Sequence, residues 1–398
     1  MHRIIALPLL AFAVWILSAC YPILTYDLAT PEPLVPTPPL TPPTRTVALP
    51  RLVVTGTPPA AVNPGEGPAP APARPAVMPP PTTHLVRASA PRFAADRARI
   101  GVGMPLGKLD DYAWGASLPG WYLNWRVEPL PIELANVHFV QMVRLFAGGF
   151  RPELTVIAAA ARAAPGMLWL IGNEPDVIWQ DNVAPEQYAA SYGILYRAIK
   201  EADPSAEVAI GGVSVPTRLR MAYLERILAA YREQNGTDMP VDVWNVHTFI
   251  LREERASWGV GIPPGMATDR GELREIGDHA DMAIFRGQVE DFRRWMAEQG
   301  LRDKPLVVSE YGILMPVEYG FPPEVVGRFM ADTFDYFLNA RDPQIGYPAD
   351  GDRLVQAFCW YSVADTVYPT PNLFDPKTRQ PTILGELFRA YVGGMGDQ

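Results

Sequence analysis

The sequence predicts an α/β protein whose folded part is one (β/α)₈ TIM barrel, preceded by a signal peptide and a disordered proline-rich linker. From about residue 97, short apolar runs alternate with longer amphipathic stretches, whereas the preceding residues show no such rhythm. Eight of the runs have the length of strands: 99–104, 120–125, 137–145, 167–172, 207–214, 241–249, 305–310 and 354–362. Eight alternating units suit a barrel of about 250 residues with insertions. The rival is a doubly wound open sheet, but residues 101–107 (GVGMPLG) lack the dinucleotide-binding spacing of its first turn.

The N-terminal residues 1–19 have the pattern of a bacterial lipoprotein signal peptide. Arg3 precedes an apolar run, residues 4–17, that is shorter than the roughly 20 residues needed to span a membrane. Residues 17–20 (LSAC) resemble a lipobox, in which the signal is cut before the cysteine and the cysteine receives lipid. We expect Cys20 to be lipidated and the protein to be extracytoplasmic, anchored to the cell membrane. The alternative is an ordinary signal peptide with a chance cysteine, and a secreted protein.

A proline-rich linker is predicted over residues 20–95. Residues 31–81 hold 18 of the 44 prolines, and they have too few periodic apolar positions to offset the entropy of ordering the chain. We expect an extended, partly polyproline stalk. Residues 96–398 then form the folded domain, which we expect to be monomeric.

The helices of that domain are predicted by amphipathic stretches at 185–202, 218–234, 282–299 and 324–339. The net charge of −9 argues against nucleic acid as a partner, because phosphate binding needs a basic surface. With Cys20 lipidated, Cys359 stands alone and no disulfide is expected. Neither a histidine pair at metal-ligand spacing nor a Gly-x-Ser-x-Gly elbow occurs, so we expect no metal and no cofactor.

Two glutamates follow or end predicted strands at the side of a barrel where chemistry takes place. Glu174, in the run Asn173-Glu174-Pro175, follows the fourth strand, and Glu310 closes the seventh. Paired carboxylates are what glycosidic bond cleavage requires, one to protonate the leaving oxygen and one to attack or stabilise the anomeric carbon. The competing interpretation makes Asn173 the N-cap of a helix, with Pro175 in its first turn and Glu174 favoured by the helix dipole.

Asn-Glu-Pro after strand four, with Glu-Tyr-Gly at strand seven, resembles the clan A retaining glycoside hydrolases over about residues 98–392. The segments that are also similar to a small single-domain branch of endo-β-1,3-glucanases are WYLNW (121–125), FVQM (139–142), GNEPD (172–176), NVHTF (245–249) and SEYG (309–312). The resemblance implies that residues 96–398 are a catalytic domain acting on an oligo- or polysaccharide. It implies Glu174 as acid/base, Glu310 as nucleophile and Asn173 as a donor to the sugar 2-hydroxyl. It favours β-1,3-linked glucan over β-1,4-linked chains.

Further substrate-binding candidates lie in the matched segments or near them. The resemblance places His247 and Trp360 around the cleaved sugar, although each could instead belong to the core. Asn124 and Tyr311 lie in matched segments. Arg144 ends strand three, where we expect it either to orient a carboxylate or simply to pair with one at the barrel rim.

Two tryptophans are further candidates for sugar binding, and one position, Phe249, differs from the pattern of the clan. Trp179 follows Glu174 by five residues, and Trp258 lies in the long connection 251–280; flat rings bind the apolar faces of sugars. The alternative for Trp258 is packing within its own loop. Many clan members carry a tyrosine near the end of strand six that hydrogen-bonds the nucleophile, but Phe249 stands here. Phe249 is the best support for the alternative function, a carbohydrate-binding lipoprotein whose barrel has lost turnover.

Overall fold

The computed structural model describes residues 93–131 and 137–395. The predicted signal peptide with Cys20, and the predicted linker up to residue 92, lie outside these residues. The strands are β1 (Ile100–Gly103), β2 (Trp121–Leu123), β3 (His138–Phe139), β4 (Gln141–Phe146), β5 (Gly149–Arg151), β6 (Leu168–Asn173), β7 (Glu207–Gly212), β8 (Trp244–His247), β9 (Leu306–Tyr311) and β10 (Ala357–Trp360). The α-helices are α2 (Asp96–Arg99), α3 (Leu154–Ala163), α4 (Pro185–Ala202), α5 (Arg218–Asn235), α6 (Met282–Glu298), α7 (Pro323–Asn339) and α8 (Ile383–Gly393). None of these helices combines the length and apolar character needed to cross a membrane.

The strands pair in two sheets, in the orders β3-β2-β1-β10-β9-β8 and β5-β4-β6-β7. All pairs are parallel except the hairpin β4–β5. Only Val140 separates β3 from β4, so one stretch of chain belongs to both sheets, and its amide bonds Tyr122 O at 2.9 Å. Two isolated parallel bridges, Ala209 to Val243 and Val213 to Val246, link β7 with the β8 segment. The parallel strands therefore neighbour one another in chain order, which is the TIM-barrel-like arrangement and not that of a doubly wound sheet.

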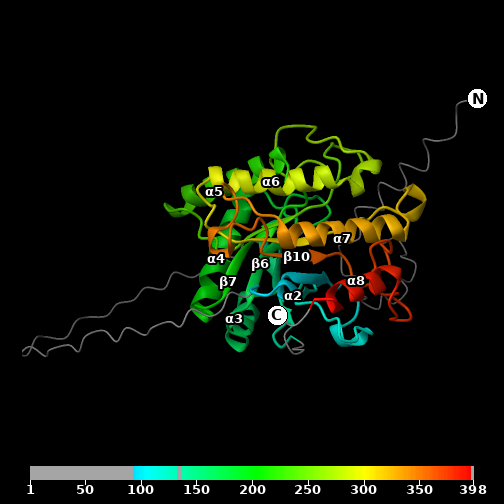
Figure 1. Ribbon diagram of the computed structural model, residues 1–398. Helices are drawn as coiled ribbons and strands as arrows, with labels where there is room; N and C mark the ends of the chain where they lie inside the picture. The colour runs from blue at the N-terminus through cyan, green and yellow to red at the C-terminus, as the bar shows by residue number, and fades with distance from the viewer. Residues whose placement is uncertain (1–92, 132–136, 396–398) are drawn as a thin grey trace, which may run out of the picture. The chain divides into compact units, whose positions relative to one another are not determined.

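Residues along each strand alternate between two hydrophobic clusters. Trp121, Leu170 and Cys359 belong to one cluster, which fills the space enclosed by the strands. Residues from the same strands, such as Tyr122, belong to the other cluster, which also contains helix residues such as Tyr188 of α4 and Phe334 of α7. Figure 1 shows the helices lying around the strands. This alternation follows from the two-residue period of a strand. Gly101 makes room for the enclosed ring, since a Cβ there would lie 2.3 Å from the Trp121 indole.

Local signals set the start of the helices that flank the site. Pro185 occupies the first position of α4, where its missing N–H costs nothing. Thr217 caps α5 by accepting a hydrogen bond from the amide of Arg220, and Asp281 caps α6 by accepting from the amides of Ala283 and Ile284. The Thr217 cap places Arg220 in the first turn of α5, where it bonds Asp176 in the turn that follows β6.

Candidate active site

The structure brings the two predicted glutamates together. Glu174 directly follows β6, and Glu310 is the penultimate residue of β9. Both are buried, with 6% and 2% of their surfaces exposed. One carboxylate oxygen of each, and a ring nitrogen of His247 at the end of β8, all lie within 4.8 Å of one another. Two acids distant in sequence thus face one small volume at the carboxyl ends of the strands, the side where barrels carry their chemistry.

The backbone of Glu174 is held in an unusual conformation. Its φ is 43°, in the left-handed region that is uncommon for residues other than glycine, and its amide bonds Gly212 O at 2.9 Å. The chain then makes a turn, with the amide of Val177 bonding Glu174 O at 3.0 Å. No helix begins here, because α4 starts only at Pro185. The interpretation of Asn173 as a helix N-cap is therefore wrong.

Asn173 is held beside Glu174 by an ion pair. Arg144 Nε donates to Asp181 Oδ1 at 2.6 Å, while Asp181 Oδ2 accepts from the amides of Leu145 and Asn173, each at 2.8 Å. Arg144 thus pairs with Asp181 and not directly with Glu174 or Glu310 in the hydrogen bonds of the described residues. The Asn173 side chain is less constrained: Nδ2 makes a long bond of 3.4 Å to Gln180, and Oδ1 has no hydrogen-bond partner among the described residues.

His247 lies between the two acids and is fully buried. Its Nδ1 is 3.0 Å from Glu174 Oε1. Burial lowers the pKa of His247, but the charges of Glu310 and Glu174 and the hydrogen bond to Glu174 outweigh it, so the pKa is raised. The ring has room only because residue 212 is glycine, where a Cβ would lie 2.6 Å from the imidazole. His247 thus contacts Glu174 and lies beside Glu310, and it is not a core histidine remote from the two acids.

Trp125, whose role the sequence did not reveal, holds the other acid. Its Nε1 donates to Glu310 Oε2 at 2.9 Å. Burial raises the pKa of Glu310 to about 7; His247 and the Trp125 hydrogen bond oppose this rise, and the charge of Glu174 adds to it. Phe249 packs edge-on against His247 at 6.2 Å and carries no donor. The signals in the sequence were that Trp125 ends the matched segment 121–125 and that Phe249 carries no donor for Glu310.

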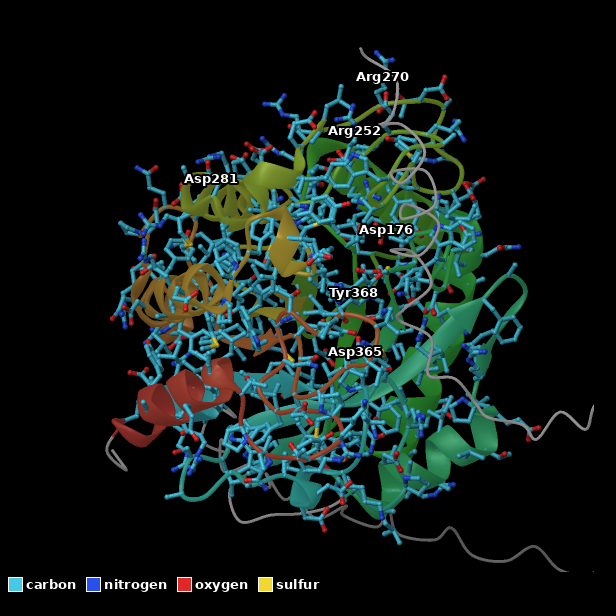
Figure 2. All side chains as sticks on the ribbon, turned by 90° about the vertical axis from the view of Figure 1, so that its right-hand side faces the viewer. Asp176, Arg252, Arg270, Asp281, Asp365 and Tyr368 are labelled. Atoms are coloured by element: carbon cyan, nitrogen blue, oxygen red, sulfur yellow. The ribbon has the colours of Figure 1, made fainter. Side chains whose placement is uncertain are left out.

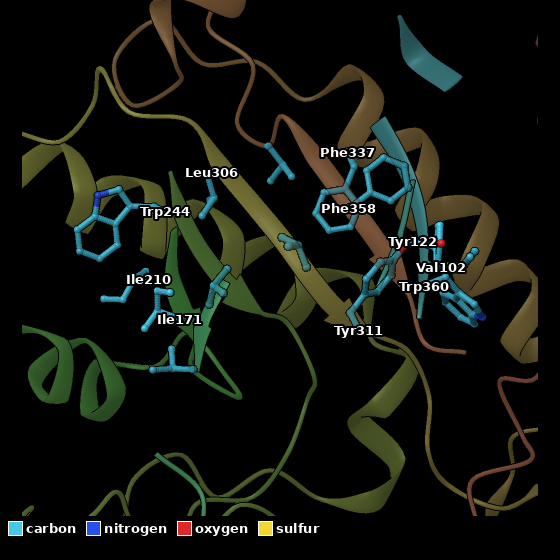
Figure 3. Packing of buried hydrophobic residues seen from close by; sticks show 14 of the residues in the cluster. Val102, Tyr122, Ile171, Ile210, Trp244, Leu306, Tyr311, Phe337, Phe358 and Trp360 are labelled. Atoms are coloured by element: carbon cyan, nitrogen blue, oxygen red, sulfur yellow. The ribbon is translucent and has the colours of Figure 1, made fainter. Parts of the chain in front are cut away.

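Trp360 and Tyr311 lie on the wrong side of their strands for the predicted roles. Figure 3 shows both among the buried rings that pack between strands and helices. Trp360 packs edge-on against Tyr311 at 5.4 Å and against Phe334 of α7 at 6.3 Å, and its Nε1 donates to Pro371 O. The Tyr311 hydroxyl accepts from Thr333 at 3.3 Å. Both side chains are fully buried, so neither offers a face to a sugar or a donor to Glu310.

Adjacent residues of a strand point to opposite faces, and this determines which side chains at the ends of β9 and β10 reach the site. Glu310 faces the enclosed volume, so its neighbour Tyr311 must face the helices. At the end of β10 the inward position belongs to Tyr361, which packs edge-on against Trp125 at 5.8 Å. The Tyr361 hydroxyl donates to Asp365 in the following loop.

The remaining candidates differ in accessibility. Trp179 is 42% exposed on the turn that follows Glu174. Trp258 is half-buried and stacks on His279 with centroids 6.0 Å apart, as the alternative of packing within its loop predicted. Asn124 donates to Glu128 Oε1 at 2.9 Å, and its Oδ1 has no partner among the described residues. Only Trp179 offers an open ring.

The cluster of Glu174, His247 and Glu310 is also compact enough to ligate a metal ion. The hydrolysis of a glycosidic bond by two carboxylates does not require one.

No protein-family model matches this sequence, and no curated protein matches it. Similar solved structures do exist. A GH128 (subgroup II) endo-β-1,3-glucanase from Pseudomonas viridiflava superposes with a TM-score of 0.51 at 18% identity, covering 74% of this chain and 97% of that one. The corresponding enzyme from Sorangium cellulosum has a TM-score of 0.50 at 17% identity, covering 73% and 98%. A glucosidase from Croceicoccus marinus has a TM-score of 0.50 at 14% identity, covering 75% and 68%. The chain thus has the TIM-barrel-like fold of the GH128 β-1,3-glucanases, as the motifs around Glu174 and Glu310 predicted.

Proposed function

We propose that the protein is a retaining glycoside hydrolase that cleaves β-linked glucan. The observation that carries the proposal is that one oxygen of each of the two buried carboxylates lies within 4.8 Å of the other. Retaining enzymes place their carboxyl groups about 5 to 5.5 Å apart, whereas inverting enzymes leave about 6.5 to 9.5 Å for a water molecule. The short separation supports direct attack by one of the two acids.

In the proposed reaction, Glu174 protonates the glycosidic oxygen as the bond to the anomeric carbon breaks. Glu310 attacks that carbon from the other face and forms a covalent glycosyl-enzyme. Glu174 then takes a proton from water, which attacks the same carbon and releases Glu310. The Trp125 hydrogen bond stabilises Glu310 in its ionised form, the form that must attack and later leave.

The raised pKa of Glu310 makes it necessary to test separately which glutamate is the acid/base and which is the nucleophile. A pKa of about 7 leaves Glu310 largely protonated below neutral pH, which by itself would suit a proton donor. The resemblance to clan A instead gives Glu310 the role of nucleophile. Glu310→Gln should abolish hydrolysis of every substrate, while Glu174→Gln should spare aryl glycosides whose leaving groups need no acid. The reverse pattern would exchange the roles, and equal losses in both variants on both substrates would refute the assignment.

The proposed substrate is a β-1,3-linked glucan cut within the chain. Two solved structures of the same fold are named endo-β-1,3-glucanases, which supports this choice of linkage. Trp179 presents an open ring near Glu174, where it can stack on a sugar several units from the cleaved bond. Trp179→Ala should weaken a hexasaccharide more than a disaccharide, and Trp179→Phe should restore most of the loss. Equal effects on both lengths, or release of glucose alone, would contradict an internal cut in a groove.

The binding-only alternative loses its main support. Phe249 favoured it because the expected donor to the nucleophile was missing, but Trp125 supplies a hydrogen bond to Glu310 at 2.9 Å. Both acids, the histidine between them and a donor to Glu310 are therefore in place, and hydrolysis is the function that this arrangement favours.

A further inference from the structure

A buried arginine connects the turn after Glu174 to the long loop after β8. Arg220, in the first turn of α5, has no exposed surface. Its Nε donates to Asp176 Oδ2 at 2.6 Å, and its Nη1 donates to Glu253 Oε1. Its Nη2 donates to the carbonyls of Val260 at 3.2 Å and Gly261 at 3.4 Å. One guanidinium thus contacts two separate segments at once.

The two carboxylates that face Arg220 are equally buried and have further donors. Asp176 accepts from the Ser214 hydroxyl at 2.6 Å and from the Ser214 amide at 3.2 Å. Glu253 accepts from the Thr217 hydroxyl and from the amide of Glu272, each at 2.6 Å. Burying three charged groups costs several kcal/mol per ion, and apolar residues of the same volume are often as stable. The cluster of Arg220, Asp176 and Glu253 is therefore better explained by the way it fixes the two segments than by a gain in stability.

Of the two segments that Arg220 connects, one begins at Glu174 and the other follows shortly after His247, the last residue of β8. Asp176 lies two residues after Glu174, in the same turn. Glu253 and Val260 flank Trp258 in the loop 251–272, which folds back on itself: the amide of Val260 bonds Arg252 O at 3.0 Å, and that of Glu253 bonds Glu272 O at 2.8 Å. Figure 2 shows Asp176 near the middle of the molecule, with Arg252 and Arg270 on the loop beyond it.

The loop and the residues around the two acids share one buried cluster. Val260 belongs to the same buried cluster as Val177 of the Glu174 turn, Phe249, which packs against His247, and Trp125, which bonds Glu310. Because interiors are close-packed, a displacement of one member is felt by its neighbours.

We propose that Arg220 is a positioning residue that sets the Glu174 turn and the loop 251–272 together, so that the acid and one wall of the substrate site are correctly placed only as a pair. The part that concerns substrate rests on the proposed hydrolase function. Arginine is needed because its planar fork donates in several fixed directions, whereas lysine carries its donors on a single atom.

Arg220→Lys tests this directly, and Arg293→Lys is the matched control. Arg293 is also fully buried on a helix, α6, but its hydrogen bonds to the protein backbone are to the carbonyls of Ile345, Lys304 and Arg302, away from the site. We expect Arg220→Lys to speed amide hydrogen exchange by at least about tenfold in both segments, 174–182 and 251–272, since several charge-assisted hydrogen bonds are lost. Arg293→Lys should leave the exchange of both segments unchanged.

Hydrolysis gives a second, separable measurement. In Arg220→Lys, kcat should fall and KM for a hexasaccharide should rise, whereas Arg293→Lys should change neither at temperatures where it is folded. If both segments loosen but the wild-type protein hydrolyses no glucan, the structural link stands and the proposed function fails. If only one segment loosens, or neither loosens more than in Arg293→Lys, the link itself is refuted.

Discussion

Replacing Trp125 by Phe removes one hydrogen bond from Glu310 and leaves an aromatic ring in place. The Trp125 N–H lies 2.9 Å from Glu310 Oε2 and stabilises the ionised carboxylate. A hydrogen bond to a charged group is worth about 1.5 to 3 kcal/mol, and one pKa unit corresponds to about 1.4 kcal/mol. Loss of the bond therefore favours the protonated form and should raise the pKa of Glu310 by about one to two units.

The assay is the dependence of kcat/KM on pH. If Glu310 must be ionised to attack, its pKa of about 7 sets the acidic limb of the profile. In Trp125→Phe this limb should move to higher pH by about one to two units, and the maximum rate should fall because the carboxylate loses its fixed orientation.

Trp121→Phe is the control for the change of ring. Trp121 belongs to the same enclosed cluster, and its Nε1 donates to the carbonyl of Arg99 at 3.0 Å, not to a catalytic group. The Trp121→Phe variant should be less stable than the wild-type protein, but the acidic limb of its pH profile should not move. An unchanged limb in Trp125→Phe, or an equal shift in both variants, would refute the role given to the indole.

Two further predictions concern the histidine and the predicted anchor. Gly212→Ala places a Cβ 2.6 Å from the His247 ring, beside the carbonyl that holds the Glu174 amide, so hydrolysis should fall by about a hundredfold, as misplaced catalytic groups do. Gly287→Ala, where a Cβ meets nothing within 4 Å, should keep full activity, and similar rates for the two variants would exclude the steric argument. Cys20→Ser should yield a precursor that keeps its signal and takes up no labelled lipid; normal lipid labelling of this variant would show that Cys20 is not the anchor.

The sequence was sufficient to predict the framework because the framework depends on local patterns. The eight apolar runs correspond to the eight parallel strand positions, and the predicted helix 185–202 is α4 in full. The helices α3 and α8 were not among the predictions, because their runs LTVIAAAARA and ILGELFRAYVG are mostly apolar and carry few polar residues. The ends of strands four and seven could be located as well, and with them Glu174 and Glu310.

The directions of side chains around the site could not be predicted in the same way. In a parallel barrel both faces of a strand are buried, so apolar alternation does not tell which residue points inward. Trp360 and Tyr361 are both large, aromatic and buried, and only the register of β10 decides that Tyr361 faces the enclosed volume. The hydrogen bond from Trp125 to Glu310 likewise depends on how two remote strand ends meet, which no local motif encodes.

The most direct test of the central claim is the configuration of the first product formed from a β-linked glucan oligosaccharide, followed by proton NMR before mutarotation. One oxygen of each carboxylate lies within 4.8 Å of the other, which is closer to the roughly 5 to 5.5 Å carboxyl separation of retaining enzymes than to the roughly 6.5 to 9.5 Å of inverting ones, so the β-anomer should appear first and the α-anomer should grow only later. Appearance of the α-anomer first would show that water attacks directly, and would contradict a covalent intermediate on Glu310.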